Sequence, residues 1–238
     1  MYTATAAEHA AGSLAPEALD GVLASLHTDG FAVVSGLLSE ECCALLAASV
    51  LEDVQLIRKD AREPTPHEMR TGHGHLQLGL RRYAPYIRSD LVANPLIESV
   101  VAAVLGEGSW LGFYNGNINT PQSGVQPLHF DRPYSWKTPE AATAAGQPWP
   151  PPTTTLSCSV ALTPITPDNG PTEIYPTSHH ETAVCTMEGN RLSRDMVAAQ
   201  AEKHPAASMI IPAGAVCFRD PRMCELLRVL HLLKWPLF

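Results

Sequence analysis

Three pairs of a histidine and a carboxylate, each separated by one residue, have the spacing of two ligands to one metal ion. They are His27 with Asp29, His129 with Asp131, and His179 with Glu181. The middle pair ends a mostly apolar, strand-like stretch, QPLHFDRPY. Side chains two apart in a strand project from the same face, so His129 and Asp131 can reach one ion. For this pair a metal site and a satisfied polar pair at a strand end both remain open, and we interpret the other two pairs as structural.

The elements that must position this pair change in type along the chain. Apolar periodicity predicts helices over residues 16–27, 39–60, 95–105 and 191–204, with Ser39 as an N-cap. It predicts strands over residues 31–34, 109–118, 124–130, 153–165, 172–178 and 208–218. Residues 61–93 and 137–152 are expected to be irregular segments that contribute to a substrate pocket. Helices followed by short strands indicate a mainly β fold, an antiparallel double-sheet barrel with helices packed on one side.

The same periodicities predict which side chains form the core. Helical positions three and four apart, and alternating strand positions, can each face one interior. The predicted core contains Phe31, Val33, Leu45, Leu46, Ile97, Val100, Val101, Val104, Leu156, Val160, Leu162, Ile210 and Val216.

Length and charge narrow the class of protein. A chain of 238 residues predicts one domain over 1–238. We expect residues 1–15 to be disordered and residues 224–238 to form an atypical tail. The net charge of -8, without a basic run, argues against nucleic acid and anionic membranes as partners. No signal peptide or membrane-spanning stretch is expected, and six cysteines without a C-x-x-C pair predict reduced thiols in the cytoplasm.

Four segments in this order carry a family resemblance: DGFAVVSGLLSEE, QPLHFD, PDNGPTEIYPTSHH and PAGAVCFRDPRM. Together they resemble the phytanoyl-CoA dioxygenase family of iron(II)- and 2-oxoglutarate-dependent oxygenases, from about residue 17 to Met223. The run HLQLGLRRYAPYI…LGFYNGN…QPLHFD is most similar to the fungal and bacterial branch that oxidises secondary metabolites. The resemblance implies a double-stranded β-helix, or jelly-roll, with Fe(II) as cofactor and 2-oxoglutarate as co-substrate.

Residue by residue, the resemblance implies roles for four positions. His129 and Asp131 match two of three iron ligands, a facial arrangement that leaves open coordination positions. Gln126 and Thr172 match positions that bind 2-oxoglutarate. Asn115, Asn117 and Asn119 alternate along a predicted strand and either line the pocket or satisfy a strand end.

The third ligand is missing from the pattern. In the family a Trp-His pair follows the FRDPRM motif, and an arginine about ten residues later binds the 2-oxoglutarate carboxylate. Here Glu225 stands at the histidine position, and Lys234 stands near the arginine position. The segment after Met223 also lacks the pattern of the family's last strands. We therefore expect the jelly-roll to be C-terminally truncated. Either Glu225 or His231 replaces the ligand, or the chain is a non-catalytic homologue, or the tail reflects a retained intron. Codons for Cys-Glu-Leu can contain GTGAGC, which resembles a fungal intron start.

Two functions therefore stay open. The first is an oxygenase acting on a small apolar substrate, which is expected to bind iron weakly and to turn over slowly or not at all. The second is an inactive jelly-roll partner subunit of a related oxygenase, with the apolar tail as its interface. A homodimer is also compatible with the sequence.

Overall fold

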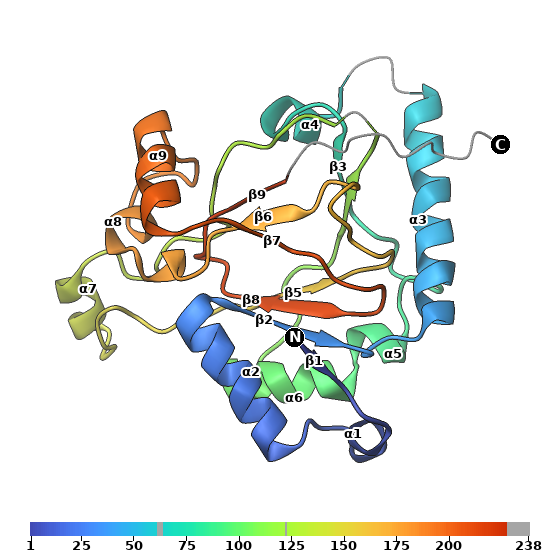
Figure 1. Ribbon diagram of the computed structural model, residues 1–238, viewed down its shortest axis with the longest axis horizontal. Helices are drawn as coiled ribbons and strands as arrows, with labels where there is room; N and C mark the ends of the chain where they lie inside the picture. Colours follow the sequence, from blue (N-terminus) through green and yellow to red (C-terminus); the bar gives the residue numbers. More distant parts are fainter. Residues whose placement is uncertain (61–63, 122, 228–238) are drawn as a thin grey trace.

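The computed structural model describes residues 1–60, 64–121 and 123–227. Its N-terminal half is mostly helical (Figure 1). In chain order the elements are β1 (Tyr2–Thr3), α1 (Ala6–Ala11), α2 (Pro16–Asp29), β2 (Phe31–Ser35), α3 (Glu40–Asp60), α4 (Pro66–Thr71), β3 (His75–Leu78), α5 (Ser89–Val92) and α6 (Pro95–Leu105).

The C-terminal half supplies most of the strands. Its elements are β4 (Gly116–Asn119), α7 (Pro139–Ala144), β5 (Ser157–Val160), β6 (Thr172–Ile174), the 3-10 helix η1 (Ser178–His180), α8 (Thr182–Cys185), α9 (Arg194–Lys203), β7 (Ala207–Ser208), β8 (Val216–Arg219) and β9 (Glu225–Leu227). The helices predicted over 16–27, 39–60, 95–105 and 191–204 are confirmed as α2, α3, α6 and α9. Ser39 caps α3 by accepting a hydrogen bond from the Cys42 amide at 3.2 Å.

The strands form three separate sheets. Their orders are β1-β2-β8-β5, β3-β4 and β7-β6-β9. Within the described residues no strand exceeds five residues, whereas α3 alone holds 21. The expectation of a mainly β chain is therefore wrong for this part of the molecule, although sheets with flanking helices are present. Glycine, proline and asparagine interrupt the apolar stretches, so only short pieces of most predicted strands form ladders. The strand predicted over 124–130 is wrong, because only isolated bridges at His129 form there.

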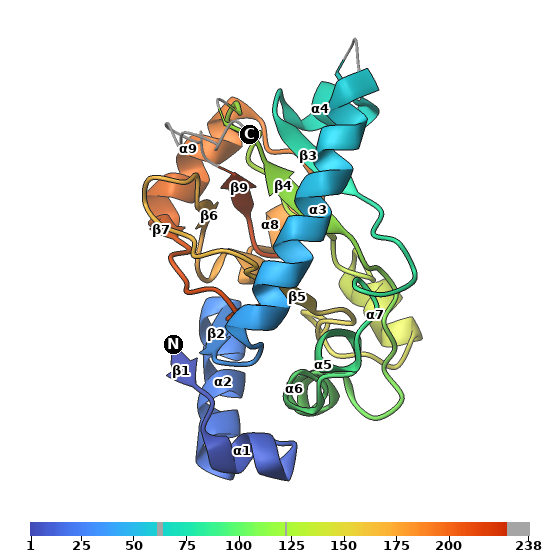
Figure 2. The same ribbon diagram turned by 90° about the vertical axis from the view of Figure 1, so that its right-hand side faces the viewer.

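Two helical layers cover the sheets. Helices α2 and α6 lie together below the four-stranded sheet, and α3 runs along one side of the molecule (Figures 1 and 2). Its buried face carries Cys42, Leu46, Val50 and Val54, four residues apart. The first half of this face packs into the cluster around Val216 and Phe218, and the second half packs against Leu76 and Leu78 of β3.

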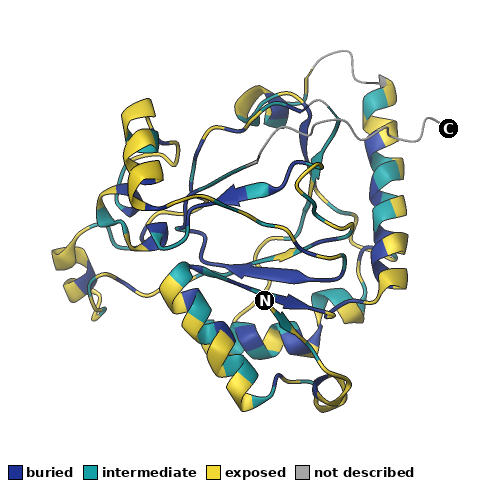
Figure 3. Ribbon diagram, in the orientation of Figure 1, coloured by how far each residue is buried: buried dark blue, intermediate teal, exposed yellow. Residues whose placement is uncertain are grey.

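Most of the predicted core is buried or half-buried. Leu46, Val100 and Val216 are buried, and the partly buried predicted residues except Val101 pack against core clusters. The buried segments gather on the strands and on the inner faces of the helices (Figure 3). Leu45 and Ile210 are corrections, because each is 44% exposed. Leu45 lies about 100° around α3 from Leu46. Ile210 precedes Ile211, whose backbone pairs with Ile165, so the two side chains take opposite sides.

Residues 1–15 are ordered, contrary to the expectation of disorder. β1 pairs in parallel with β2, and Thr5 caps α1 in a capping box with Glu8. The buried Glu8 carboxylate also accepts hydrogen bonds from the Tyr2 hydroxyl and the Ala15 amide. The alanine- and threonine-rich composition concealed these local contacts.

Three further segments differ from expectation. Residues 61–93 contain α4, β3 and α5, and residues 137–152 contain α7. The start of the expected atypical tail is a regular strand, because β9 pairs antiparallel with β6. Residues 228–238 lie outside the described residues.

Candidate metal centre

The centre is assembled by backbone pairing between two segments far apart in sequence. His129 and Glu225 exchange both backbone hydrogen bonds, at 3.0 Å from the His129 amide and 2.7 Å from the Glu225 amide. Residues directly opposite in an antiparallel pair place their side chains on the same face. Pro221 accepts hydrogen bonds from the amides of Asp131 and Arg132. The turn between β8 and β9 thus holds the Asp131 backbone beside the His129–Glu225 pair.

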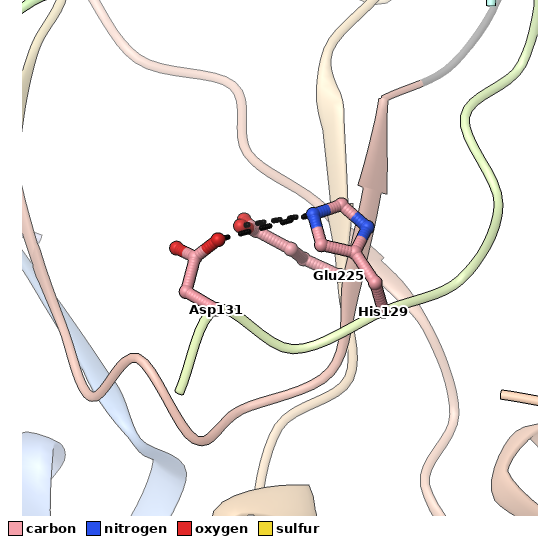
Figure 4. A group of neighbouring side chains, drawn as sticks. All are labelled: His129, Asp131 and Glu225. Carbon is pink, nitrogen blue, oxygen red and sulfur yellow. Dashed lines mark ion pairs between the residues drawn. The ribbon is translucent and has the colours of Figure 1, made fainter. Parts of the chain in front are cut away.

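Three ligand-type side chains converge there (Figure 4). The His129 Nε2 atom lies 3.9 Å from Asp131 Oδ1 and 4.0 Å from Glu225 Oε1. One ligand atom from each of the three lies within 4.8 Å of the others. The structure therefore brings His129 and Asp131 together and places the Glu225 carboxylate beside them.

The imidazole of His129 is oriented by its own backbone. Its Nδ1 atom lies 2.9 Å from the Pro127 carbonyl oxygen, which can only accept a hydrogen bond. Nδ1 therefore carries a proton, and Nε2 faces the two carboxylates. This is the arrangement in which a histidine binds a metal ion.

Arg219, at the end of β8, completes the cluster. One of its terminal nitrogens, Nη2, lies 2.7 Å from Asp131 Oδ2 and 2.7 Å from Glu225 Oε1. We did not predict this residue as part of the site. One signal in the sequence could have identified it: a single arginine ends an apolar strand. A buried cation needs a carboxylate partner, so such an arginine predicts an acidic side chain nearby.

Burial and Arg219 act in opposite directions on the two carboxyl groups. Burial, together with the charge of Asp131, raises the pKa of Glu225 to about 7 against the opposing effect of Arg219. For Asp131, burial also raises the pKa, but the Arg219 guanidinium outweighs it and holds the pKa below its ordinary value. The two carboxylates raise the pKa of Arg219 above its ordinary value despite its burial.

The cluster opens to solvent on one side. The Asp131 side chain is 42% exposed, whereas those of Glu225 and Arg219 are 13% and 8% exposed. An ion or small molecule therefore approaches from the Asp131 side.

The residues present fit a divalent cation. One imidazole nitrogen and two carboxylate oxygens are ligands that iron(II) and other first-row metals accept. One ligand atom from each residue lies within 4.8 Å of the others, so small side-chain movements would let all three hold one ion. Arg219 already neutralises part of the negative charge of these carboxylates, so an incoming cation meets a partly neutralised centre.

The two residues predicted to bind 2-oxoglutarate are related to the centre by strand pairing and by sequence position. Ile174 pairs with Glu225 across the β6–β9 ladder, so these two side chains lie on the same face of the sheet. Thr172 is two residues before Ile174 in β6 and therefore belongs to that face as well. Gln126 is buried three residues before His129. Their roles toward 2-oxoglutarate stay predictions. The alternative third ligand, His231, lies outside the described residues.

Other polar residues noted in the sequence have structural partners. Asn119 Oδ1 lies 2.9 Å from His75 Nδ1, and Asn117 accepts hydrogen bonds from Gln77 and Asn115. Glu181 forms ion pairs with Lys203 and His204. Among the described residues, the cluster around His129 is the one group of three or more metal-ligating side chains.

The sequence model of the family described as Phytanoyl-CoA dioxygenase (PhyH) matches residues 26–224. The chain belongs to the phytanoyl-CoA dioxygenase family. The matched region includes His129, Asp131 and Arg219 and stops one residue before Glu225. The third position of the centre therefore lies beyond the part that the family pattern supports.

Solved structures with the same fold agree with this family assignment. The carbocyclase SnoK from nogalamycin biosynthesis, described as non-heme and α-ketoglutarate-dependent, is 20% identical with a TM-score of 0.59, covering 91% of this chain and 78% of SnoK. EctD from S. alaskensis with 2-oxoglutarate and 5-hydroxyectoine is 18% identical with a TM-score of 0.59, covering 92% and 71%. The epimerase SnoN, in complex with Fe3+, α-ketoglutarate and nogalamycin RO, is 17% identical with a TM-score of 0.61, covering 92% and 80%. At these identities the likeness establishes the fold of this phytanoyl-CoA dioxygenase family member.

Across residues 1–60, 64–121 and 123–227, no helix has both the length and the apolar character needed to cross a membrane.

Proposed function

We propose that this protein is an iron(II)- and 2-oxoglutarate-dependent dioxygenase that oxidises a small, mostly apolar secondary metabolite. The observation that carries the proposal is the convergence of His129 Nε2 with the carboxylates of Asp131 and Glu225. Iron(II), when bound there with 2-oxoglutarate, supplies the activation of dioxygen needed to oxidise a carbon–hydrogen bond. Membership of the family supports this chemistry.

The protein's own groups have distinct tasks in this proposal. His129 presents its Nε2 from a ring that the Pro127 carbonyl orients through Nδ1, and Asp131 supplies a carboxylate from the solvent-facing side. Gln126 and Thr172 donate hydrogen bonds to the co-substrate. Glu225 takes the position of the third protein ligand. We also infer a closed jelly-roll around the centre and a cytoplasmic protein; the six free cysteines support the latter.

We infer that the substrate enters through a polar cavity. It has a volume of about 330 Å³ and is lined by residues 132–135, Lys137, 152–155 and Arg222. Arg132 follows Asp131 directly, so the cavity begins beside the exposed ligand. A larger cavity of about 690 Å³ lies between α2, β2 and residues 208–211. Neither cavity is lined by a predicted site residue, but only the smaller one begins at the residue next to Asp131. We therefore place the substrate in the smaller cavity, with a polar group of the substrate near its arginines.

A second function is favoured by the composition of the centre itself. The third ligand position holds an acidic Glu225 paired with Arg219 instead of a neutral imidazole. Such a centre fits a non-catalytic homologue that acts as partner subunit of a related oxygenase. The two functions differ in whether the protein binds iron and consumes 2-oxoglutarate.

Anaerobic titration with iron(II) in the presence of 2-oxoglutarate, followed by the absorbance of the complex, tests the proposal. The dioxygenase is expected to show weak but saturable binding that His129→Ala abolishes. His73→Ala is the matched control, because that side chain is 71% exposed and outside the centre. Slow succinate formation in air should accompany binding. Absence of binding at saturating 2-oxoglutarate would instead support the partner-subunit function.

A further inference from the structure

Arg219 occupies the position of a cation in the centre. Its Nη2 atom bridges Asp131 and Glu225 at 2.7 Å from each, closer than either carboxylate is to His129 Nε2. The side chain is 8% exposed, so these contacts are shielded from water and salt. The Arg219 guanidinium therefore already balances part of the negative charge of the two carboxylates.

The contacts of the two carboxylates differ. Asp131 uses Oδ2 toward Arg219 and keeps Oδ1 toward the imidazole. Glu225 uses a single oxygen, Oε1, for both neighbours, at 2.7 Å from Arg219 and 4.0 Å from His129 Nε2. A metal ion beside His129 therefore competes with the guanidinium for Glu225 Oε1, whereas Asp131 can bind both cations at once.

The guanidinium has only part of its hydrogen-bonding capacity satisfied. Its other terminal nitrogen, Nη1, is buried and has no hydrogen-bond partner among the described residues. Since an arginine in a fully built ion-pair network satisfies its donors, this one is not held in place by a second acceptor on that side. Movement of the guanidinium away from Glu225 breaks one strong contact without breaking a wider network.

We propose that Arg219 is a built-in competitor of the metal ion: its guanidinium holds Asp131 and Glu225 in the metal-free protein, and iron(II) binds only as it leaves Glu225. The inference rests on the proposed function and deepens it, because it explains weak metal binding by a residue outside the ligand set. Arg219 is thus a positioning residue that sets the metal affinity. A purely structural ion pair between β8 and β9 would instead stabilise the fold without changing that affinity.

Arg219→Gln tests the competition by calorimetric titration with iron(II) alone under anaerobic conditions. The variant is expected to bind iron about tenfold tighter or more, because both carboxylates become available to the ion. Arg132→Gln is the matched control: it removes the same charge beside Asp131, but from an exposed side chain that forms no described contact with either carboxylate. It should change the dissociation constant by no more than about twofold, because exposed charges are screened.

Stability measurements keep the test decisive if Arg219→Gln folds poorly. The variant leaves two carboxylates without their cation, so its metal-free melting temperature should fall and iron should raise it more than in the wild type. Arg219→Lys keeps the charge but loses the planar fork. We expect its iron affinity to lie between those of the wild type and Arg219→Gln.

The outcomes separate the two proposals. Equal iron affinity of the wild type, Arg219→Lys and Arg219→Gln, with binding lost in His129→Ala, overturns the role of Arg219 and leaves the metal centre intact. Equal tightening by Arg132→Gln also overturns it, because the effect would then be one of general charge. Absence of iron binding in every variant, including Glu225→His, overturns both this inference and the proposed function.

Discussion

Compared with the histidine expected at position 225, glutamate changes the charge of the centre more than its geometry. The β9 backbone pairs with His129 and delivers a side chain to the third position, whichever residue stands there. A carboxylate brings a second negative charge and attracts Arg219, whereas an imidazole would bring a neutral donor. Two histidines and one carboxylate form the facial arrangement typical of non-haem iron oxygenases.

Glu225→His is therefore expected to tighten iron(II) binding about tenfold or more, since the imidazole adds a nitrogen donor and removes a contact of Arg219. Anaerobic calorimetry measures the change. Glu225→Gln is the control of similar size, which removes the charge without adding a strong donor, and it should bind iron no tighter than the wild type. Equal tightening by both variants would mean that charge alone limits binding.

At the scale of elements, α3 links the core beneath the four-stranded sheet with the cluster around β3. Leu46 is 2% exposed within the first cluster, and its neighbour Leu45 is 44% exposed. The two leucines share a helix, a residue type and nearly the same position along the axis. They differ in the direction in which they point.

Leu46→Ala should lower the free energy of unfolding by about 2–5 kcal/mol, because it leaves a cavity in the core. Leu45→Ala should change it by about 0.5 kcal/mol or less, since its side chain is already in contact with water. Urea denaturation of the two variants measures both values. If the two variants lost a similar free energy of unfolding, Leu45 would have to form a contact that this single chain does not show.

A second element, α4, is joined to the end of α3 by an ion pair between Glu68 and Arg58. The carboxylate, with a fully buried side chain, accepts hydrogen bonds from the Arg58 guanidinium, the Thr65 amide and the Gly74 amide. Burial alone would raise the pKa of Glu68, but these donors lower it to about 2. A carboxyl group whose pKa is lower in the folded state stabilises the fold above its unfolded pKa.

The stabilising effect of Glu68 is thus expected to be complete above about pH 4.5 and to disappear as the pH falls toward 2. Glu68→Gln should cost about 1–3 kcal/mol at pH 7, and the difference from the wild type should shrink at pH 3. Glu202→Gln, an exposed change on α9, is the control and should be nearly neutral at both pH values. A difference that stays constant with pH would exclude the ionised carboxylate as its cause.

The sequence was informative where a pattern repeats within one element. The N-cap Ser39 and apolar periodicity located α3. The histidine–carboxylate spacing occurs three times, and the strand-end context singled out His129 and Asp131, which belong to the one metal-ligand cluster of the described residues. It was less informative where the outcome depends on pairing between distant segments. The strand character of Glu225 depends on His129 and Ile174, and the role of Arg219 depends on two acids that are 88 and 6 residues away. The capping box of α1 depends only on residues close in sequence and could have been predicted. The alanine- and threonine-rich composition of the segment led us to expect disorder instead.

For the whole molecule, the order of sheets decides what the centre contains. β8 belongs to the four-stranded sheet and β9 to the three-stranded sheet, and the turn between them carries the chain from one to the other. Arg219 ends the first strand and Glu225 begins the second. The centre therefore lies where the two sheets meet, and any change in the segment after β8 changes both the third ligand and the chain that follows it.

The last prediction concerns this segment as a unit. A chain in which residues 224–238 are replaced by a Trp-His-Arg-Gly segment and two following strands with a second arginine should bind both iron and 2-oxoglutarate tightly. The histidine supplies the third ligand, and the second arginine supplies a bidentate partner for the distal carboxylate of the co-substrate. Glu225→His alone should gain iron affinity but little affinity for 2-oxoglutarate, because it adds no such arginine.

Succinate formation by the wild type, Glu225→His and the replaced chain, at saturating iron(II) and 2-oxoglutarate, measures the difference. We expect the rates to rise in that order, with the replaced chain at least about tenfold above the wild type. Rapid turnover by the wild type would show that Glu225 suffices as a ligand and that the replaced segment is dispensable. A folded but silent replaced chain would instead locate the defect outside this segment and favour the partner-subunit function, because both groups needed at the centre would then be present.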